Sequence, residues 1–214
     1  MRHLLQIIAL IFAVSSFTSS AYAGMQTYEN IPDGFQEYTV KKGDTWFSIV
    51  SGQEDYVLLA MRVNRVDAKH LRPGMRILVP VSQEAFLHTP IPTSIDDANA
   101  RHLVVYLDVQ YFGAYEYGKL VHWGPVSSGK RGHETVTGTF RAIWKDRWHR
   151  SRKYGNVPMF FAVQFYGNYF THEQSLPGYP ASHGCVRMLK EDAQWKFSWI
   201  QKGDPVTVKV SSMN

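Results

Sequence analysis

The chain contains one cysteine, Cys185, and two histidines near it in sequence that could act as its base, His172 and His183. At neutral pH a free thiol is mostly protonated, and a neighbouring imidazole can take that proton and stabilise the thiolate. In an extended segment residues 183 and 185 point to the same side, whereas His172 reaches the thiol only if the loop after it closes back. The pattern predicts a Cys–His nucleophilic site and leaves both histidines open as the base.

The residues around Cys185 limit the reactions that its thiol could carry out. A lone cysteine is a small buried hydrophobe, an intermolecular link or a reactive thiol. Arg187 shares the face of Cys185 in an extended segment, so it could hold a substrate carboxylate or form a structural salt bridge. No histidine follows Cys185, which excludes the order found in papain-like endopeptidases. Sortases place His before Cys and remain the runner-up, although their separation is longer and they lack Ser-His-Gly before the Cys.

The elements that must position these residues are mostly strands. After Arg101 the sequence alternates and is rich in β-branched and aromatic residues, which predicts a mainly β (α+β) domain over 99–210. One helix is expected at Lys190–Gln201. A glycine-rich loop is expected at 127–135, and the basic run Trp144–Lys153 is either a lid that recognises carboxylates or a solvated hairpin arm. The expected strands are His102–Val109, Gln110–Tyr117, Leu120–Val126, Gly138–Trp144, Met159–Phe165 and Asp204–Val210.

Residues 37–80 predict a separate small module in the order strand, helix, helix, strand. Asp44 or Thr45 can cap the first helix, which carries Trp46, and Asp55 can cap a second helix over Tyr56–Asn64. The strands are expected at Glu37–Val40 and Met75–Val79. Residues 81–98 are rich in Pro, Thr and Ser, which predicts a semi-rigid linker.

The start of the chain predicts export. Residues 1–23 combine a basic start, the apolar run Leu4–Val14 and the small-x-small triplet Ala21-Tyr22-Ala23, as in a cleaved signal peptide. The apolar run is too short for a membrane anchor, and no cysteine follows it to carry a lipid. The mature chain is expected to begin near Gly24 with a lead-in over 24–36. The formal net charge of +5 suits an anionic partner, and nucleic acid is not expected outside the cytoplasm.

The N-terminal module resembles the LysM domain. The stretches that carry the resemblance are Tyr38-Thr39-Val40-Lys41-Lys42-Gly43-Asp44-Thr45 and Leu71-Arg72-Pro73-Gly74-Met75-Arg76-Ile77-Leu78-Val79-Pro80. LysM domains bind glycans that contain N-acetylglucosamine, such as peptidoglycan and chitin. The resemblance implies a groove between Gly43–Thr45 and Val66–Arg72, with Gly43, Asp44 and Thr45 as contacts. The alternative is that these three residues only cap the helix.

The C-terminal domain resembles the L,D-transpeptidase catalytic domain of the YkuD family. Phe170-Thr171-His172 and Ala181-Ser182-His183-Gly184-Cys185-Val186-Arg187-Met188 match its signature, and Ser127-Ser128-Gly129-Lys130 and Thr135–Phe140 are also similar. The resemblance implies a β-sandwich, Cys185 as nucleophile and His172 as base. It implies that Ser182, His183, Gly184 and Arg187 shape the site. Backbone N–H groups near Gly184 and Cys185 are expected to bind the oxyanion.

This sequence departs from the family at two positions. Glu173 follows the base where Gly is common, and Val136 stands where Pro is usual. The group that orients the imidazole is therefore open between a side chain and a backbone carbonyl.

Together these resemblances imply an exported peptidoglycan L,D-transpeptidase of the periplasm or cell wall. Cys185 would attack the stem peptide after its third residue, release D-alanine and pass the acyl group to an amine. Glycan strands and stem peptides are the expected partners, with a second stem or a wall-anchored lipoprotein as acceptor. No metal or organic cofactor is implied, and carbapenems are expected to acylate the thiol. The alternatives are a hydrolase (an L,D-carboxypeptidase or amidase) and a non-catalytic wall-binding protein.

Overall fold

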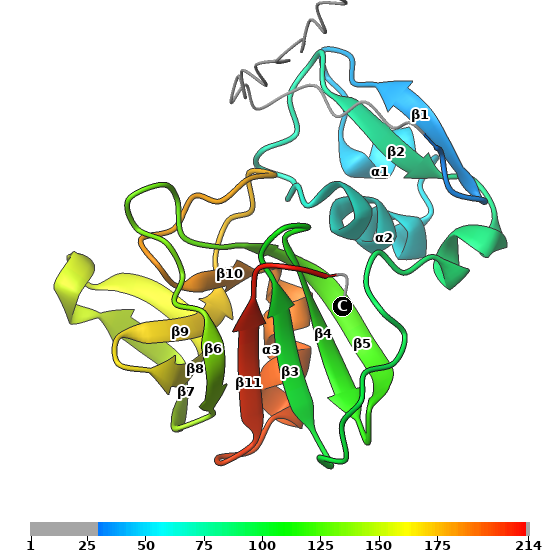
Figure 1. Ribbon diagram of the computed structural model, residues 1–214. Coiled ribbons are helices and arrows are strands. Elements are labelled where there is room, and N and C mark those ends of the chain that lie inside the picture. Colours follow the sequence, from blue (N-terminus) through cyan, green and yellow to red (C-terminus); the bar gives the residue numbers. More distant parts are fainter. Residues whose placement is uncertain (1–29, 213–214) are drawn as a thin grey trace, which may run out of the picture.

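The computed structural model describes residues 30–212, which form two sheets (Figure 1). In the smaller sheet β1 (Phe35–Thr39) pairs antiparallel with β2 (Arg76–Pro80). The helices α1 (Trp46–Ile49) and α2 (Glu54–Asn64) connect them and bury a core that includes Trp46 and Ile77. The predicted export signal, residues 1–23, lies outside the described residues. Among those that are described, no helix is long and apolar enough to cross a membrane.

The helix starts in this module correct one expectation. Thr45 caps α1 as predicted, because its side chain accepts from the Ser48 N–H in a capping box. Asp55, in contrast, lies inside α2 and does not cap it. The cap residue is Gln53, which forms no side-chain capping bond, and Arg65 in the left-handed conformation ends the helix.

The larger sheet has nine strands in the order β6-β11-β3-β4-β5-β10-β9-β8-β7. Only the pairs β11–β3 and β10–β9 are parallel. The helix α3 (Lys190–Trp199) follows β10, and short 3-10 turns η1 (Gln83–Leu87) and η2 (Arg152–Tyr154) precede β3 and β8. The strands are β3 (His102–Tyr106), β4 (Tyr111–Glu116), β5 (Lys119–Ser127), β6 (Gly138–Arg141), β7 (Trp144–Ser151), β8 (Val157–Tyr166), β9 (Tyr169–Glu173), β10 (Val186–Met188) and β11 (Pro205–Lys209).

The sheet curls, so that strands far apart in its order meet. The ring of Phe140 on β6 lies 5.7 Å from that of Phe165 and 4.9 Å from that of Tyr166, both on β8. Apolar side chains from both parts of the sheet and from α3 fill the enclosed core, among them Phe112, Val163 and Ala193. The predicted mainly β fold is confirmed, and its sandwich-like core comes from one curled sheet.

Two segments bear on the sequence expectations. Trp144–Lys153 forms the hairpin arm that one of the two alternatives predicted, because most of it is β7, which is largely exposed and pairs antiparallel with β8. Residues 81–98, predicted as a linker, are held against the larger sheet. Ile91 is buried beside Tyr115, and the N–H of Ile95 donates to the Gly118 carbonyl at 2.8 Å.

Candidate active site

The parallel pairing of β9 and β10 brings the sequence-predicted residues together. Thr171 is paired with Val186, and His172 with Arg187. Side chains alternate between the two faces of a strand, so the paired Arg187 and His172 lie on the same face, as does Phe170, two residues before His172. Cys185, just before β10, packs against Phe170 and so lies on this face too. Val186 points to the opposite face and joins the core. The register therefore gathers a thiol, an imidazole and a guanidinium on one surface of the sheet.

His172 is oriented by the backbone. Its ring is buried, and Nδ1 lies 2.8 Å from the carbonyl oxygen of Glu173. A carbonyl can only accept, so Nδ1 carries the proton and Nε2 is left as the basic nitrogen of the neutral ring. Burial, opposed by this hydrogen bond, lowers the pKa of His172 to about 4. The imidazole is therefore neutral at pH 7, and a backbone carbonyl holds its tautomer.

Cys185 is half-buried and packs against Met159, Ala162 and Phe170. Its Sγ–H donates to the Asn168 carbonyl at 3.7 Å. Burial raises the pKa of the Cys185 thiol, although a backbone hydrogen bond at Phe170 and the charges of Arg187 and Lys153 act in the opposite direction. With His172 also neutral, the free chain holds a neutral thiol–imidazole pair. A preformed thiolate–imidazolium pair is disfavoured by burial of both groups.

The loop before the thiol is locked by its own hydrogen bonds. Ser182 Oγ donates to the carbonyl of Cys185 at 2.5 Å and accepts from the N–H of Gly184 at 3.0 Å. Thr135 Oγ1, from the glycine-rich loop, donates to the Gly184 carbonyl at 2.8 Å. The N–H of Gly184 is thus occupied by Ser182, which removes it from the expected set of oxyanion donors.

Gly184 is required where it stands. Its φ of +116° lies in a region that other residues rarely adopt, and an added Cβ would lie 2.8 Å from Cε1 of Tyr169. This conformation breaks the extended geometry on which a local role for His183 depended. His183 is exposed, and its ring contacts those of His133 and Tyr154 at centroid distances of 4.7 and 5.3 Å. Within residues 30–212 neither histidine forms a hydrogen bond with the thiol. His172 is favoured because it is buried and its Nδ1 is fixed by the Glu173 carbonyl, whereas His183 is exposed.

Arg187 is half-buried beside the thiol. The alternative of a structural salt bridge is not realised, because the side chain of Arg187 forms no ion pair or hydrogen bond within residues 30–212. Its charge lowers the pKa values of both His172 and Cys185. A half-buried guanidinium without a protein partner is suited to a bidentate contact with a carboxylate from outside the chain.

A hollow of about 700 Å³ opens above Cys185. The strand β7 supplies much of its wall, and the ring of His149 stacks on Phe170 at 5.0 Å. The basic run therefore lines the site, as the lid interpretation requires. His149 and Asn168 were not predicted as site residues. His149 lies within the aromatic strand β7, and Asn168 lies in the turn between β8 and β9. Basic side chains in the lining are Arg150, Arg152 and Lys153.

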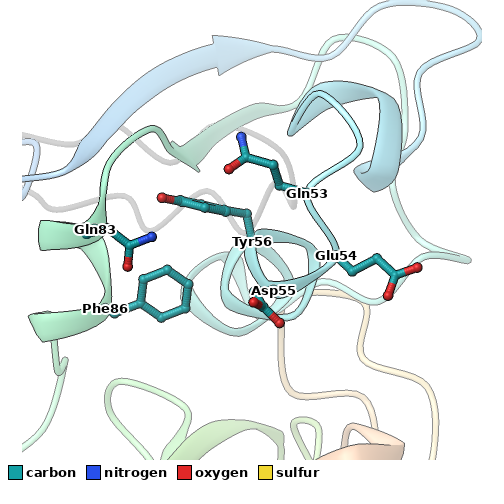
Figure 2. A pocket seen from close by; sticks show the side chains of 6 residues that line it. All are labelled: Gln53, Glu54, Asp55, Tyr56, Gln83 and Phe86. Carbon is teal, nitrogen blue, oxygen red and sulfur yellow. The ribbon is translucent and has the colours of Figure 1, made fainter.

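A second hollow, of about 390 Å³, lies between the start of α2 and η1 (Figure 2). Carboxylates, amides and two rings line it, including Asp55, Gln83 and Phe86, and no cysteine or histidine is among them. Within residues 30–212 no cluster of three or more His, Cys, Asp or Glu is arranged to hold a metal ion. The Cys185 hollow is therefore the candidate catalytic site.

The predicted glycan contacts serve the local fold. Asp44 Oδ2 accepts from the N–H of Lys41 at 2.7 Å and from the Tyr38 hydroxyl at 2.8 Å, which lowers the pKa of Asp44. Thr45 caps α1, and Gly43 adopts a φ of +93°. The backbone at Gly43 is open to solvent on the side of an added Cβ, which would meet no atom within 4 Å.

Comparison with known families decides the assignment of the larger sheet. The model of the YkuD L,D-transpeptidase catalytic domain matches residues 100–208, about half of the chain. The chain belongs to the L,D-transpeptidase family. The LysM domain model matches residues 38–80, so this member of the family carries an N-terminal LysM module.

A solved L,D-transpeptidase structure agrees in fold, and others are similar in part. An L,D-transpeptidase from Stackebrandtia nassauensis is 24% identical with a TM-score of 0.51, over 55% of this chain and 59% of that chain. One from Mycobacterium smegmatis is 25% identical with a TM-score of 0.48, over 52% and 59%. The match thus spans less than two thirds of either structure. Comparison with curated proteins gave no match.

Proposed function

We propose that this chain is an exported cysteine L,D-transpeptidase of peptidoglycan. The observation that supports the proposal is the pairing of β9 with β10, in which Arg187 lies beside an imidazole whose Nδ1 is bound to the backbone, together with the packing of Cys185 on Phe170 of the same strand. Membership of the L,D-transpeptidase family suggests the reaction, and the roles of the residues are inferred from the geometry of the site.

In the proposed reaction, Sγ of Cys185 attacks the carbonyl after the third residue of a tetrapeptide stem, and its proton passes to Nε2 of His172. The tetrahedral intermediate collapses, and the imidazolium gives the proton to the departing amine of D-alanine. An amine acceptor then attacks the thioester and passes its proton to His172, which returns it to the leaving thiolate. The imidazole acts first as base and then as acid, as its unprotonated Nε2 permits.

The stem peptide is proposed as substrate because its carboxylates suit the charge around the thiol. Arg150, Arg152 and Lys153 line the hollow that contains Cys185, and Arg187 lies two residues past the thiol on β10, so cations surround the nucleophile. Arg187 is assigned to the carboxylate of the departing D-alanine. The acceptor is proposed to be an amine on a second stem or on a wall-anchored lipoprotein.

The domain division proposed from these results is a LysM module over 37–80, a connecting segment over 81–98 and a catalytic domain over 99–210, after a signal peptide over 1–23. The LysM module is proposed to bind glycan strands through Gly43, Asp44 and Thr45. Because residues 81–98 are packed, the module would hold a glycan at a fixed place relative to Cys185.

Incubating the protein with disaccharide-tetrapeptides and identifying the products by mass tests the proposal. Cross-linked dimers together with free D-alanine are expected, and both should vanish in Cys185→Ala. Tripeptides without dimers, even when an amine acceptor is added, would establish a hydrolase instead. The absence of any product, with glycan binding retained, would establish a non-catalytic wall-binding protein.

A further inference from the structure

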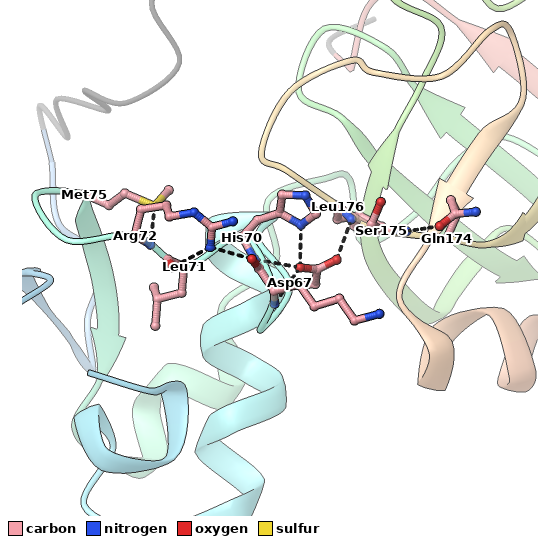
Figure 3. A network of polar contacts seen from close by, with 9 residues as sticks. Asp67, His70, Leu71, Arg72, Met75, Gln174, Ser175 and Leu176 are labelled. Carbon is pink, nitrogen blue, oxygen red and sulfur yellow. Dashed lines mark hydrogen bonds and ion pairs between the residues drawn. The ribbon is translucent and has the colours of Figure 1, made fainter. Parts of the chain in front are cut away.

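The loop that joins His172 to Cys185 is held by the LysM module (Figure 3). The backbone N–H of Asp67 donates to the Leu176 carbonyl at 3.0 Å, and the Leu176 N–H donates back to Oδ2 of Asp67 at 2.8 Å. An isolated bridge between Val66 and Pro177 continues this contact. Leu176 is fully buried, so the loop is docked on the module and does not merely touch it.

The two oxygens of Asp67 serve two different structures. Oδ2 accepts from the N–H of Leu176 and so holds the loop between His172 and Cys185. Oδ1 accepts from the backbone N–H groups of Lys69 and His70, at 2.9 and 3.0 Å, and lies 2.7 Å from Nδ1 of His70. These contacts fix the turn after α2, which is one wall of the groove that the LysM resemblance implies. One carboxylate thus bridges the glycan-binding module and the active-site loop.

Asp67 is not alone in joining the LysM module to the catalytic domain. Arg62 at the end of α2 forms an ion pair of 2.6 Å with the buried Asp192 of α3. The Tyr111 hydroxyl on β4 donates to the Val63 carbonyl at 2.7 Å. These contacts anchor α2 on the catalytic domain, so the turn after α2 that carries Asp67 has a fixed position relative to that domain.

Both ends of the loop already have partners in the catalytic domain. At the start, the Gln174 N–H donates to the Met188 carbonyl at 3.2 Å, and at the far end Ser127 Oγ donates to the Tyr179 carbonyl at 2.7 Å. Between them, Leu176 is held by hydrogen bonds to Asp67. The loop begins at Glu173, whose carbonyl orients His172, so a shift of its middle bears directly on the imidazole.

We propose that Asp67 of the LysM module is a positioning residue for the His172–Cys185 pair. It touches neither substrate nor the reacting atoms, and it acts by fixing the loop whose first carbonyl orients the base and whose last residues carry the thiol. The LysM module is then part of the catalytic scaffold. The inference rests on the proposed roles of His172 and Cys185.

The test uses the full chain and the variants Asp67→Asn and Asp67→Ala, with Asp33→Asn as matched control. Asp33 is exposed and forms no hydrogen bond or ion pair within residues 30–212. Asn keeps the shape of Asp67 but places an NH₂ group where one of the two oxygens accepts, so either the turn or the loop loses its acceptor. The substrate is a free tetrapeptide without sugar, so that glycan affinity does not enter.

Two readouts are measured. The first is kcat/KM, expected to fall about 10-fold in Asp67→Asn, mainly in kcat, because a catalytic pair displaced by a fraction of an ångström loses its alignment. The second is the pH profile of iodoacetamide alkylation, which reads Cys185 alone because the chain has one cysteine. A loosened loop admits water to the thiol, so this profile should move to lower pH.

The proposal is overturned if folded Asp67→Asn matches Asp33→Asn in both readouts. The alkylation profile needs no turnover, so it still decides the matter if the wild-type chain proves inactive, which would refute the proposed function alone. If Asp67→Ala unfolds, Asp67→Glu supplies the remaining comparison. It keeps both oxygens, and recovery of at least half of the alkylation shift is expected, whereas a profile equal to that of Asp67→Asn would contradict the proposal.

Discussion

Nδ1 of His172 lies 2.8 Å from the carbonyl oxygen of Glu173, the residue that follows it in the chain. A base oriented in this way needs no third side chain, because the backbone itself accepts the Nδ1 proton. It also explains how Glu173 can stand where the family commonly has glycine, since the orienting group is the carbonyl. The relationship makes His172, with its free Nε2, the residue on which the proposed chemistry depends.

Replacing His172 should therefore abolish acylation, while replacing His183 should not. For His172→Ala we expect kcat/KM on the tetrapeptide to fall at least about 100-fold, the usual contribution of a general base. His183→Ala removes an exposed ring that packs against the rings of His133 and Tyr154, and should stay within about 3-fold of wild type. Steady-state kinetics on both variants checks this, and equal losses would show that the base was misassigned.

The pH profile should be broad. The active form of the free enzyme carries a neutral His172 and a protonated Cys185. Activity should fall on the acid side near the His172 pKa of about 4, as the base becomes protonated. On the alkaline side it should fall only above the ordinary thiol range, because burial raises the pKa of Cys185.

The kcat/KM profile, measured in buffers of constant ionic strength, tests this assignment. A thiolate–imidazolium pair would behave differently, since the thiol would then titrate well below its ordinary range. Fast iodoacetamide alkylation of the wild-type protein at pH 5, unchanged up to pH 9, would contradict the neutral pair.

Arg187 should discriminate substrates by their carboxylate. In Arg187→Met we expect kcat/KM for the tetrapeptide acid to fall about 10-fold, the cost of losing a charged hydrogen bond. The same variant should scarcely distinguish the acid from its D-alanine amide, whereas wild type should prefer the acid. Lys202→Met, which removes an equal charge from an exposed position, controls for long-range electrostatics. A preference for the acid retained in Arg187→Met would disprove the assignment.

Gly184 and Gly132 form a matched pair for testing the loop. Both have positive φ, but an added Cβ at Gly132 meets nothing within 4 Å, whereas at Gly184 it lies 2.8 Å from Tyr169. Gly132→Ala should lower the free energy of unfolding by about 1 kcal/mol. Gly184→Ala should cost at least about 2 kcal/mol, since the ring of Tyr169 or the loop must also move. Urea denaturation measures both, and equal losses would mean that Tyr169 does not constrain the loop.

The mainly β fold could be predicted because its strands are rich in β-branched and aromatic residues, as in β3 and β8, and because α1 has a recognisable start at Thr45. β10 could not be predicted from periodicity, since three residues hold too little pattern. Its parallel pairing with β9 is a long-range contact. That pairing nevertheless decides which face Cys185 shares with His172, and no local signal encodes it.

Other parts of the site could be predicted from the sequence only in part. Trp144–Lys153 resembled a loop because β7 is largely exposed on both faces, so it lacks the burial pattern of a strand. The choice between His172 and His183 depended on the positive φ of Gly184. The sequence cannot predict this φ, because glycine adopts negative and positive φ about equally readily. The hydrogen bonds between Asp67 and Leu176 join two domains, so no local pattern predicts them. Residues 81–98 were predicted to be a linker, although the structure packs them against the larger sheet.

The most direct test of the central claim is the intact mass of the protein during turnover. Wild-type protein mixed with disaccharide-tetrapeptide and quenched in acid should gain the mass of the substrate less D-alanine, and peptide mapping should place it on Cys185. His172→Ala should gain this mass at least about 100-fold more slowly, and Cys185→Ala should not gain it at all. Release of D-alanine or formation of dimers by Cys185→Ala, or an adduct on any other residue, would contradict the account.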